Sequence, residues 1–520
     1  MRRSDQVCVT SGRFIFSTVS GRSVHWIFLR YTLWKHTLWR RLGVPGPTPF
    51  PFLGSIKDLA VKGMSKTDQD LVPKYGSVVG VYNGTIPVLL VTDTDLIKEI
   101  FIKEYQTFTN RVVILKTDDL LNSMITAAED DHWKFIRSTM TPTFTSGKLK
   151  TMLPMILRCC DDLVNNINGK MEQNESVEMT EVFGGFTLDV IASTAFGLQV
   201  NSQKEPDNDF VTNAKKALPA EVVKPYFLIV MIFPFLKNLM GTLFKAPVFG
   251  EGSEEFFRNI VQQLVAERKS NTNNNFKDFI QLMLNSHKEK EIKTENGKID
   301  ELGGLDFAEY KNRGMNENEI LANSMVFFGA GYDTTMNTLS FAAYLLALHP
   351  DMQERLFTEI DNELEKRPPT YDSLPNMQYL EMFLNEVLRL YAAVPRINRR
   401  AKNDITVNGM FIPKDTDVTI PISALHRNPK YWPEPEKFDP ERFTDENKAT
   451  RPMYSFLPFG LGPRVCIGMR LALIETKYAL ISTVQNFKFV VCSKTEIPMP
   501  LQKGFITRPL NGVHLKIEKR

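Results

Sequence analysis

The segment FGLGPRVCIG at positions 459–468 is the most informative part of the chain, because it holds one cysteine in a glycine-rich loop. Gly460, Gly462 and Gly468 lack a Cβ atom, so the backbone can lie close to a flat ligand and turn through φ values closed to other residues. Residues 469–480 carry apolar side chains at helical spacing. This pattern predicts that Cys466 lies at or just before the N-terminus of a helix.

The position of Cys466 indicates a metal ligand. Free N–H groups and the dipole at a helix N-terminus favour the thiolate, so we expect them to lower the pKa of the Cys466 thiol. A lone cysteine is more often a small buried hydrophobe, but the surrounding loop favours ligation. Because no second Cys or His follows at zinc-like spacing, the thiolate suits the axial position of haem iron, where it pushes electron density onto the metal. Arg464 is placed to pair with a haem propionate.

Length and composition are compatible with an enzyme that encloses a large cofactor. The 520 residues could form one large helical fold or two or more ordinary domains. The net charge of +3, with both signs of charge mixed along the chain, argues against nucleic acid as a partner. Five cysteines without a framework spacing favour reduced thiols on a cytosol-facing surface.

Basic residues interrupt every apolar run of an atypical N-terminal leader, residues 1–43. Its best apolar run, residues 24–29, is far shorter than the ~20 residues that cross a bilayer, so no membrane-spanning helix is predicted. The basic and tryptophan side chains suit an anionic membrane surface; a disordered or targeting-like leader is the alternative. Alternating prolines in residues 44–52 then predict a stiff hinge where the folded body begins.

Residues 53–520 are predicted to form a single domain. Apolar spacing predicts helices over residues 95–105, 133–140, 148–167, 185–195 and 253–268, and composition predicts exposed linkers over about 270–276 and 288–312. Residues 78–82 and 87–91 predict a hairpin with Asn83-Gly84 in a type I′ turn. The most apolar stretch, residues 222–249, is interrupted by Pro234 and predicts either a core helix or a lid whose aromatic face dips into lipid.

A second chemical signal lies in a long predicted helix. Asn316 with Glu319 is typical of a helix start, and the pattern continues to about Leu348, which gives a rod of roughly 50 Å. Its middle reads AGYDTT at positions 330–335. If this turn faces the iron, Gly331 leaves space for dioxygen, Thr334 donates a hydrogen bond to it and Asp333 relays protons from solvent. The alternative is an Asp-Thr pair on a solvated helix face.

A third cluster places opposite charges on one helix face. Glu386 and Arg389 are three residues apart, and their apolar neighbours indicate burial. A buried ion pair needs further partners, and Arg442 in the proline-rich segment 438–443 is a candidate third member.

With these clusters in this order, the chain resembles the cytochrome P-450 superfamily over roughly residues 40–520. The segments VPGPTP (44–49), FTNR (108–111), PTFTSGKLK (142–150) and NGMFIPK (408–414) are similar to family three, subfamily A. The resemblance implies a mainly α fold with small β-sheets (α+β), a helix-rich triangular prism that holds haem b between the long central helix and the helix after the cysteine loop. It implies a monooxygenase for steroids, fatty acids and xenobiotics on the cytosolic face of the endoplasmic reticulum membrane.

The resemblance also implies partners and residue roles. Electrons would come from NADPH through a flavoprotein reductase, with cytochrome b5 as a further partner, and Lys134, Arg470 and Lys477 would meet an acidic reductase surface. Cys466 would be the axial ligand, Asp333 and Thr334 the proton-delivery pair, and Glu386, Arg389 and Arg442 a structural triad. Haem would be bound by Arg111, Trp133, Arg137, Arg399, Phe459, Arg464 and Gly468. The substrate pocket would include Thr126, Ala127, Gly329, Ala330, Val394 and Ile397.

Three departures from the family pattern are visible. Gly329 stands where the subfamily usually has a bulky aromatic residue, which indicates more space beside the oxygen site. Ala392 replaces a usual proline, so that turn is less rigid, and the leader lacks the family's apolar anchor helix. Two other functions stay open: a reductase-independent haem-thiolate peroxide isomerase, and a non-catalytic haem-binding protein. Asp333 and Thr334 argue against the isomerase, because its chemistry needs no proton delivery.

Overall fold

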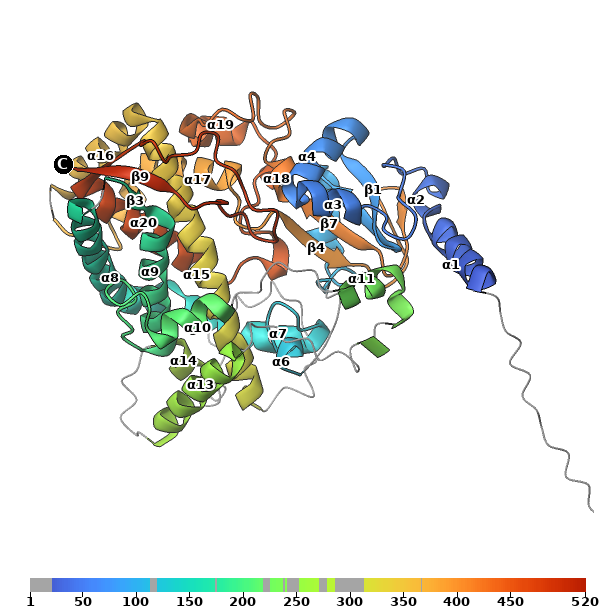
Figure 1. The fold of residues 1–520 in the computed structure, drawn as a ribbon, viewed down its shortest axis with the longest axis horizontal. Coiled ribbons are helices and arrows are strands. Elements are labelled where there is room, and N and C mark those ends of the chain that lie inside the picture. Colours follow the sequence, from blue (N-terminus) through green and yellow to red (C-terminus); the bar gives the residue numbers. More distant parts are fainter. Residues whose placement is uncertain are drawn as a thin grey trace, which may run out of the picture.

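The computed structural model describes residues 21–112, 119–173, 175–217, 225–236, 239–240, 252–270, 278–285, 313–365 and 367–520. A region of packed helices occupies one side of the molecule and a region built around a small β-sheet occupies the other (Figure 1). The predicted α+β architecture, mainly helical with small sheets, is confirmed. The predicted linkers fall almost wholly on residues outside the described ranges.

The long predicted helix is confirmed as α15 (Glu317–Leu348), which runs through the helical region (Figure 1). Its start is fixed by a capping box: the Asn316 side chain accepts from the Glu319 N–H at 2.8 Å, and the Glu319 carboxylate accepts from the Asn316 N–H at 2.8 Å. The helix is apolar on most of its faces, which is typical of a helix buried on all sides. It packs against α9 (Met179–Ile191), α13 (Ser253–Ser270), α17 (Gln378–Leu390) and α20 (Met469–Asn486).

The other predicted helices are also present. The prediction over 95–105 corresponds to α5 (Thr94–Lys98), capped by Asp93 and continued by a π-helical turn, Glu99–Lys103. Further helices are α7 (Asp130–Met140), α8 (Ser146–Gln173), α10 (Asp209–Ala217), α14 (Phe279–Asn285) and α16 (Pro350–Leu364). The structure also contains α3 (Ile56–Lys62), α4 (Met64–Tyr75), α6 (Asp119–Asn122), α11 (Pro225–Ile232), α18 (Ile422–Leu425) and α19 (Asp445–Ala449).

The largest described sheet has the strand order β1-β2-β7-β4, formed by Val78–Asn83, Ile86–Val91, Asp417–Pro421 and Arg396–Arg400. Strands β2 and β7 are parallel, and the other two pairs are antiparallel. Two smaller sheets join β3 (Val177–Glu178), β9 (His514–Lys519) and β8 (Phe487–Val490), and β5 (Ile405–Val407) with β6 (Met410–Ile412). Strand β4 matters for function because it brings Ile397 and Arg399 beside the cysteine loop.

The predicted hairpin is confirmed, but the predicted type I′ turn is wrong. Asn83 pairs with Ile86, so Gly84 and Thr85 are the central residues of the turn. Of these two only Gly84 has a positive φ (64°), whereas a type I′ turn requires positive φ at both. The backbone of α11 lies against this turn, since the Thr85 N–H donates to the Met231 carbonyl at 3.0 Å. A side chain at Gly84 would collide with that carbonyl.

The predicted start of the folded body at residue 44 is also wrong. Helices α1 (Gly21–Lys35) and α2 (Leu38–Arg41) precede it, and the end of the leader is buried against β1. The Trp39 indole N–H donates to the Val81 carbonyl at 2.9 Å, and the Tyr82 hydroxyl donates to the His36 carbonyl at 3.0 Å. The indole ring adds buried apolar area that the proline pattern did not indicate. Among the described residues, no helix has the length and apolar character needed to cross a membrane.

Candidate active site

A cavity of about 480 Å³ lies between the middle of α15 and the loop that carries Cys466. α15 contributes Ala330, Gly331, Thr334, Thr335 and Thr338 to its wall, and the loop contributes residues 457–460 and 464–468. Helix α20 continues the wall beyond the loop. The two segments singled out from the sequence, far apart along the chain, therefore border the same space.

The cysteine loop is built by tight turns. The Cys466 N–H donates to the Phe459 carbonyl at 3.0 Å, which closes the loop on itself. Gly460 (φ 76°) and Gly462 (φ 68°) adopt left-handed backbone conformations, as expected. Gly468 does not: its φ is −86°, and it lines the cavity as the residue before α20. The Cys466 side chain is exposed because it opens into the cavity.

The expectation of a lowered thiol pKa at Cys466 is wrong for the protein alone. The Cys466 thiol faces the enclosed cavity rather than bulk solvent, and this loss of solvent raises its pKa by more than the Gly468 and Met469 N–H groups, Arg111 and Arg137 lower it. The N–H groups of the helix start do act in the expected direction, but they are weaker than the loss of solvent. Coordination of a metal cation deprotonates a thiol outright.

Four arginines gather at one end of the cavity. Arg111, Arg137 and Arg464 line it, while Arg399 lies behind them, buried, with its guanidinium over the ring of Phe101. Arg111 donates to the Arg464 carbonyl at 3.3 Å and Arg137 to the Val465 carbonyl at 3.0 Å, so both hold the cysteine loop. Arg464 donates to the Ala128 carbonyl at 2.8 Å.

This arginine cluster carries uncompensated positive charge. None of its four members forms an ion pair with a carboxylate of the described residues, and the Nε atoms of Arg399 and Arg464 have no hydrogen-bond partner there. Burial lowers the pKa of Arg464 to about 9, with a further contribution from Arg111, and burial also lowers the pKa values of Arg111, Arg137 and Arg399. The cluster therefore fits a ligand that brings its own carboxylates.

In the middle of α15, the contacts of Thr334 and Gly331 can be compared with the roles predicted for them. The Thr334 hydroxyl lines the cavity and donates to the Ala330 carbonyl, one turn back in the helix, at 2.6 Å. Gly331 lines the cavity, and a Cβ atom there would lie 2.8 Å from Cδ1 of Ile191 on α9, which lines it too. That Gly331 leaves space for dioxygen stays a prediction.

Asp333 faces away from the cavity. Its carboxylate accepts from Arg508 Nε at 2.9 Å and from the Asn337 side chain at 3.1 Å, and it is not among the cavity-lining residues. Burial raises the pKa of Asp333, and Arg508 opposes that shift. The acid and the alcohol are neighbours on the helix, but their side chains point to different surroundings.

Comparisons with known proteins agree with this site. The family model described as "Cytochrome P450" matches residues 44–515. The chain belongs to the cytochrome P450 family. It is 41% identical over 496 residues to Cytochrome P450 3A25 of Mus musculus, with 95% of each chain covered, and 42% identical over 492 residues to Cytochrome P450 3A9 of Rattus norvegicus, with 94% of each covered. The predicted resemblance to family three, subfamily A is confirmed. This P450 is thus a haem-thiolate monooxygenase whose electrons come from NADPH.

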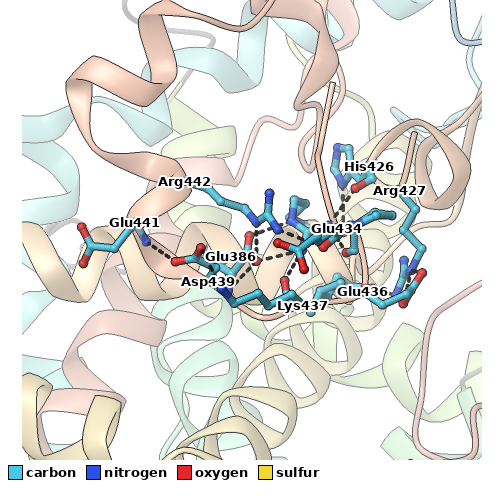
Figure 2. Close-up of polar contacts among 12 residues, drawn as sticks. Glu386, His426, Arg427, Glu434, Glu436, Lys437, Asp439, Glu441 and Arg442 are labelled. Atoms are coloured by element: carbon cyan, nitrogen blue, oxygen red, sulfur yellow. Dashed lines mark hydrogen bonds and ion pairs between the residues drawn. The ribbon is translucent and has the colours of Figure 1, made fainter. Parts of the chain in front are cut away.

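The Glu386 and Arg389 side chains of this P450 are fully buried and form a bidentate pair, with distances of 2.6 Å and 2.8 Å. Arg442 lies 3.4 Å from Glu386, and the Asp439 N–H donates to the same carboxylate at 2.8 Å (Figure 2). The rest of the Arg389 guanidinium donates to the carbonyls of His426, Pro435 and Lys437. The three residues predicted as a triad do lie together.

His426 connects this triad to the cysteine loop, a link that the sequence did not reveal. Its Nε2 accepts from the Leu457 N–H at 2.8 Å, so Nδ1 carries the proton and donates to the Arg389 carbonyl at 3.2 Å. Burial lowers the pKa of His426 to about 3, with a smaller contribution from Arg389, which keeps the ring neutral. A lone histidine carries no signal for such a role in the sequence.

Four of the six predicted pocket residues line the cavity: Thr126, Ala330, Val394 and Ile397. Ala127 and Gly329 do not line it. Ala127 is the buried neighbour of Thr126 in a loop held by Asn323 of α15, which accepts from the Ile125 N–H at 2.8 Å. Gly329 lies off the helix face marked by Ala330 and Thr334, and the extra space expected beside the oxygen site stays a prediction.

Other residues that line the cavity were not predicted from the sequence. Phe144, Phe279 and Phe327 form a cluster of rings with centroids 4.8–5.4 Å apart, and Arg396 lines the cavity while paired to buried Asp68. Asn398 and Glu475 also line it. Thr335 and Thr338 could have been found from their helical spacing to Thr334. The aromatic residues could not, because their approach depends on tertiary packing between distant segments.

Proposed function

We propose that Cys466 is the axial ligand of the haem and that substrate binds between it and Thr334. The observation that carries this proposal is the position of the Cys466 thiol, open to the cavity that Thr334 lines from the opposing helix. When bound, haem supplies the activation of dioxygen that puts one oxygen atom into an unactivated C–H bond and releases the other as water. The protein supplies the thiolate, the binding surface and the protons.

The arginine cluster would hold the two propionates. Arg111, Arg137 and Arg464 offer donors at the cavity wall, and Arg399 adds charge from behind. The Trp133 ring supports the Arg464 guanidinium at 4.2 Å from the ring centre, which orients the guanidinium plane. Phe459 and Gly468 also line the wall. Gly468 has no side chain that could collide with a flat ligand, and a Cβ atom there would meet no protein atom within 4 Å.

Thr334 would hold a proton at the reacting centre. Its O–H donates within α15, so its oxygen keeps a lone pair toward the cavity that can accept from a water molecule. Thr334→Ala is expected to release more hydrogen peroxide per NADPH consumed, because the hydroxyl no longer positions that proton. The measurement is peroxide and NADPH in the same assay with reductase; Thr358→Ala, at an exposed threonine of α16, is the control. Unchanged coupling in Thr334→Ala would remove this residue from the proton route.

The chemistry of the wall favours large lipophilic substrates such as steroids, fatty acids and xenobiotics. Its described side chains are mostly apolar, including Ile191, Val394, Ile397 and the ring cluster of Phe144, Phe279 and Phe327. Polar groups are interspersed among them: Thr126 has no hydrogen-bond partner among the described residues, whereas Asn398 already accepts from the Val112 N–H at 3.1 Å. Pockets of this kind bind by apolar area and orient by isolated polar groups.

Partners and location follow from surface chemistry. A flavoprotein reductase, with cytochrome b5 as a further partner, would meet the exposed Arg470 near the cysteine loop; Lys134 and Lys477 lie nearby but pair with Asp131 (3.0 Å) and Glu381 (3.3 Å). The leader and the apolar stretch also meet: Phe28 packs on Phe233 with ring centroids 5.0 Å apart.

The joined surface of α1 and of residues 229–236 and 239–240 would lie on the endoplasmic reticulum membrane at its cytosolic face. Trp26, Trp34, Phe235 and Leu239 are each more than half exposed there. Lys35 and Arg41 lie over the Trp34 ring and would meet anionic headgroups. Comparing membrane and soluble fractions of cells that express the wild type and Phe235→Ser tests this: the variant should shift toward the soluble fraction.

Substrate-dependent consumption of NADPH with reductase, with an oxygen-18 label from dioxygen appearing in the product, tests the reaction itself. Monooxygenation predicts one labelled atom per product molecule. A product formed without NADPH would instead indicate the peroxide isomerase, and haem binding without turnover would indicate a non-catalytic haem protein.

A further inference from the structure

A buried asparagine ties α15 to the part of the chain that carries Thr126. Asn323 is fully buried in the second turn of α15. It precedes Val326 and Phe327, the first residues of α15 that line the cavity, by three and four positions and so lies on the same helix face. Asn323 itself does not line the cavity, so its side chain can act on a substrate only through other residues.

The Asn323 carboxamide bonds three backbone groups. Its Oδ1 accepts from the Ile125 N–H at 2.8 Å, and its Nδ2 donates to the Ser123 carbonyl at 2.9 Å and to the Glu319 carbonyl at 2.7 Å. Two of these bonds cross to residues 123–128, which follow α6 and precede α7 and are called the 123–128 segment below. The third holds the side chain against its own helix. An apolar side chain of similar size would leave the Ile125 N–H and the Ser123 carbonyl unpaired inside the protein.

The 123–128 segment is held at its other end by the cysteine loop. The Ala128 carbonyl accepts from Arg464 Nη2 at 2.8 Å. Thr126 lies between the two points of attachment, with Asn323 on one side and Arg464 on the other. Its position in the cavity wall is therefore set by two long-range contacts rather than by a helix or strand of its own.

Thr126 has the free polar group of this segment. Its side chain is exposed to the cavity, and its hydroxyl has no hydrogen-bond partner among the described residues. The attachment through Asn323 comes from α15, which also carries Thr334 and lies across the cavity from the Cys466 loop. Asn323 thus holds the segment to the wall of the cavity against which substrate is proposed to bind.

We propose that Asn323 is a positioning residue for the substrate. By holding the 123–128 segment, it keeps the Thr126 hydroxyl where this group can bond an oxygen atom of a lipophilic substrate, such as a steroid ketone. A substrate fixed at that oxygen presents one part of its carbon skeleton to Thr334, so Asn323 contributes to the choice of the oxidised carbon. This inference rests on the proposed function, and it names the part of the wall that orients the substrate.

Hydrogen–deuterium exchange of the holoenzyme, followed by mass spectrometry, tests the attachment. In Asn323→Leu the Ile125 N–H loses its acceptor, so the 123–128 segment should exchange about tenfold faster than in wild type. Gln353→Leu is the matched control, because Gln353 is a fully buried carboxamide of α16 that accepts from the Phe489 N–H at 2.8 Å and does not line the cavity. Exchange of the segment should be unchanged in that variant. Equal exchange in wild type and Asn323→Leu would overturn the inference.

Asn323→Thr makes the same test with less damage to the helix. A threonine hydroxyl can donate to the Glu319 carbonyl, as the Thr338 hydroxyl does to the Thr334 carbonyl at 2.8 Å. The shorter side chain keeps this bond within α15 and loses the two bonds that cross to the 123–128 segment. Faster exchange is therefore expected in Asn323→Thr as well, and its absence there would also overturn the inference.

A double-mutant cycle with testosterone as the probe tests the effect on substrate. Asn323→Leu and Thr126→Val should each raise the dissociation constant, measured by titration of the ferric haem absorbance, by roughly twofold to tenfold. Each should also change the ratio of hydroxylated products formed with reductase and NADPH. The double variant should differ little from Thr126→Val, because Asn323 acts through Thr126. Gln353→Leu should leave binding and product ratio unchanged.

Additive effects in the double variant, or a product ratio in Asn323→Leu equal to that of wild type, would overturn the positioning role. All of these variants should keep the carbon monoxide spectrum of a thiolate-ligated haem, because none of them alters the cysteine loop. A wild-type protein without that spectrum would instead contradict the haem assignment. Failure of this inference is thus distinct from failure of the proposed function.

Discussion

This P450 contains two buried groups of arginines, and they differ in whether the arginine charge is paired within the protein. In the triad, Arg389 donates to both oxygens of Glu386 and to three backbone carbonyls, so its charge and its donors are satisfied within the protein. At the cavity, Arg111, Arg137, Arg399 and Arg464 have no described carboxylate partner. The triad therefore serves the fold, and the arginines at the cavity serve a ligand.

The free energies follow from this difference. A buried ion pair with all its hydrogen bonds formed is expensive to break, because the remaining partner stays charged and unsolvated. Several unpaired guanidinium groups instead destabilise the protein alone, and a ligand with negative charge offsets that cost when it binds. Substitutions in the two clusters should therefore have opposite effects on the haem-free protein.

The largest effect is expected for Arg389→Ala, which leaves the Glu386 carboxylate buried without its partner. The free energy of unfolding should fall by about 3–5 kcal/mol, measured by denaturant unfolding of the holoenzyme. Lys150→Ala, which removes one partner of the exposed Lys150–Asp372 pair, is the control and should change it by less than about 1 kcal/mol. A comparable loss in both variants would contradict a special role for the triad.

A smaller effect is expected for Arg464→Met, which should not destabilise the haem-free protein but should weaken haem binding. Removing one unpaired charge should leave the haem-free protein as stable as wild type or more stable, whereas the holoenzyme should release haem faster. One charge-assisted hydrogen bond contributes about 1.5–3 kcal/mol, which corresponds to roughly tenfold to a hundredfold in the dissociation constant. Transfer of haem to an acceptor protein measures the rate. A stable haem complex in Arg464→Met would show that the cluster does not hold the propionates.

The smallest effect concerns His426, the neutral link between the triad and the cysteine loop. Its folded pKa of about 3 lies below the unfolded value of about 6.5. The unfolded chain therefore takes up a proton first, and stability is lost as pH falls from about 6.5 toward 3. At pH ~5 the loss amounts to about 2 kcal/mol. In His426→Asn this part of the pH slope should be absent; an unchanged slope would mean that other groups cause it.

Local signals in the sequence predicted much of this architecture. The capping box at Asn316, the glycine turns at 460 and 462 and the period of α15 depend on neighbouring residues, and all are present. The long-range contacts were not predictable in the same way. Trp39 is buried against β1 and Gly331 lies against Ile191, because distant segments pack there. The partner of Asp333 is Arg508, near the C-terminus, and no sequence motif indicates that pairing.

The most direct test of the account is the spectrum of the reduced protein with carbon monoxide. Wild type should show the red-shifted Soret band of a thiolate-ligated haem, because the Cys466 thiol opens to the cavity and the arginine cluster beside it lacks a negative partner. Cys466→Ala should lose that band, while Cys492→Ala, at a cysteine outside the cavity wall, should keep it. The same red-shifted band in Cys466→Ala would contradict haem ligation by Cys466.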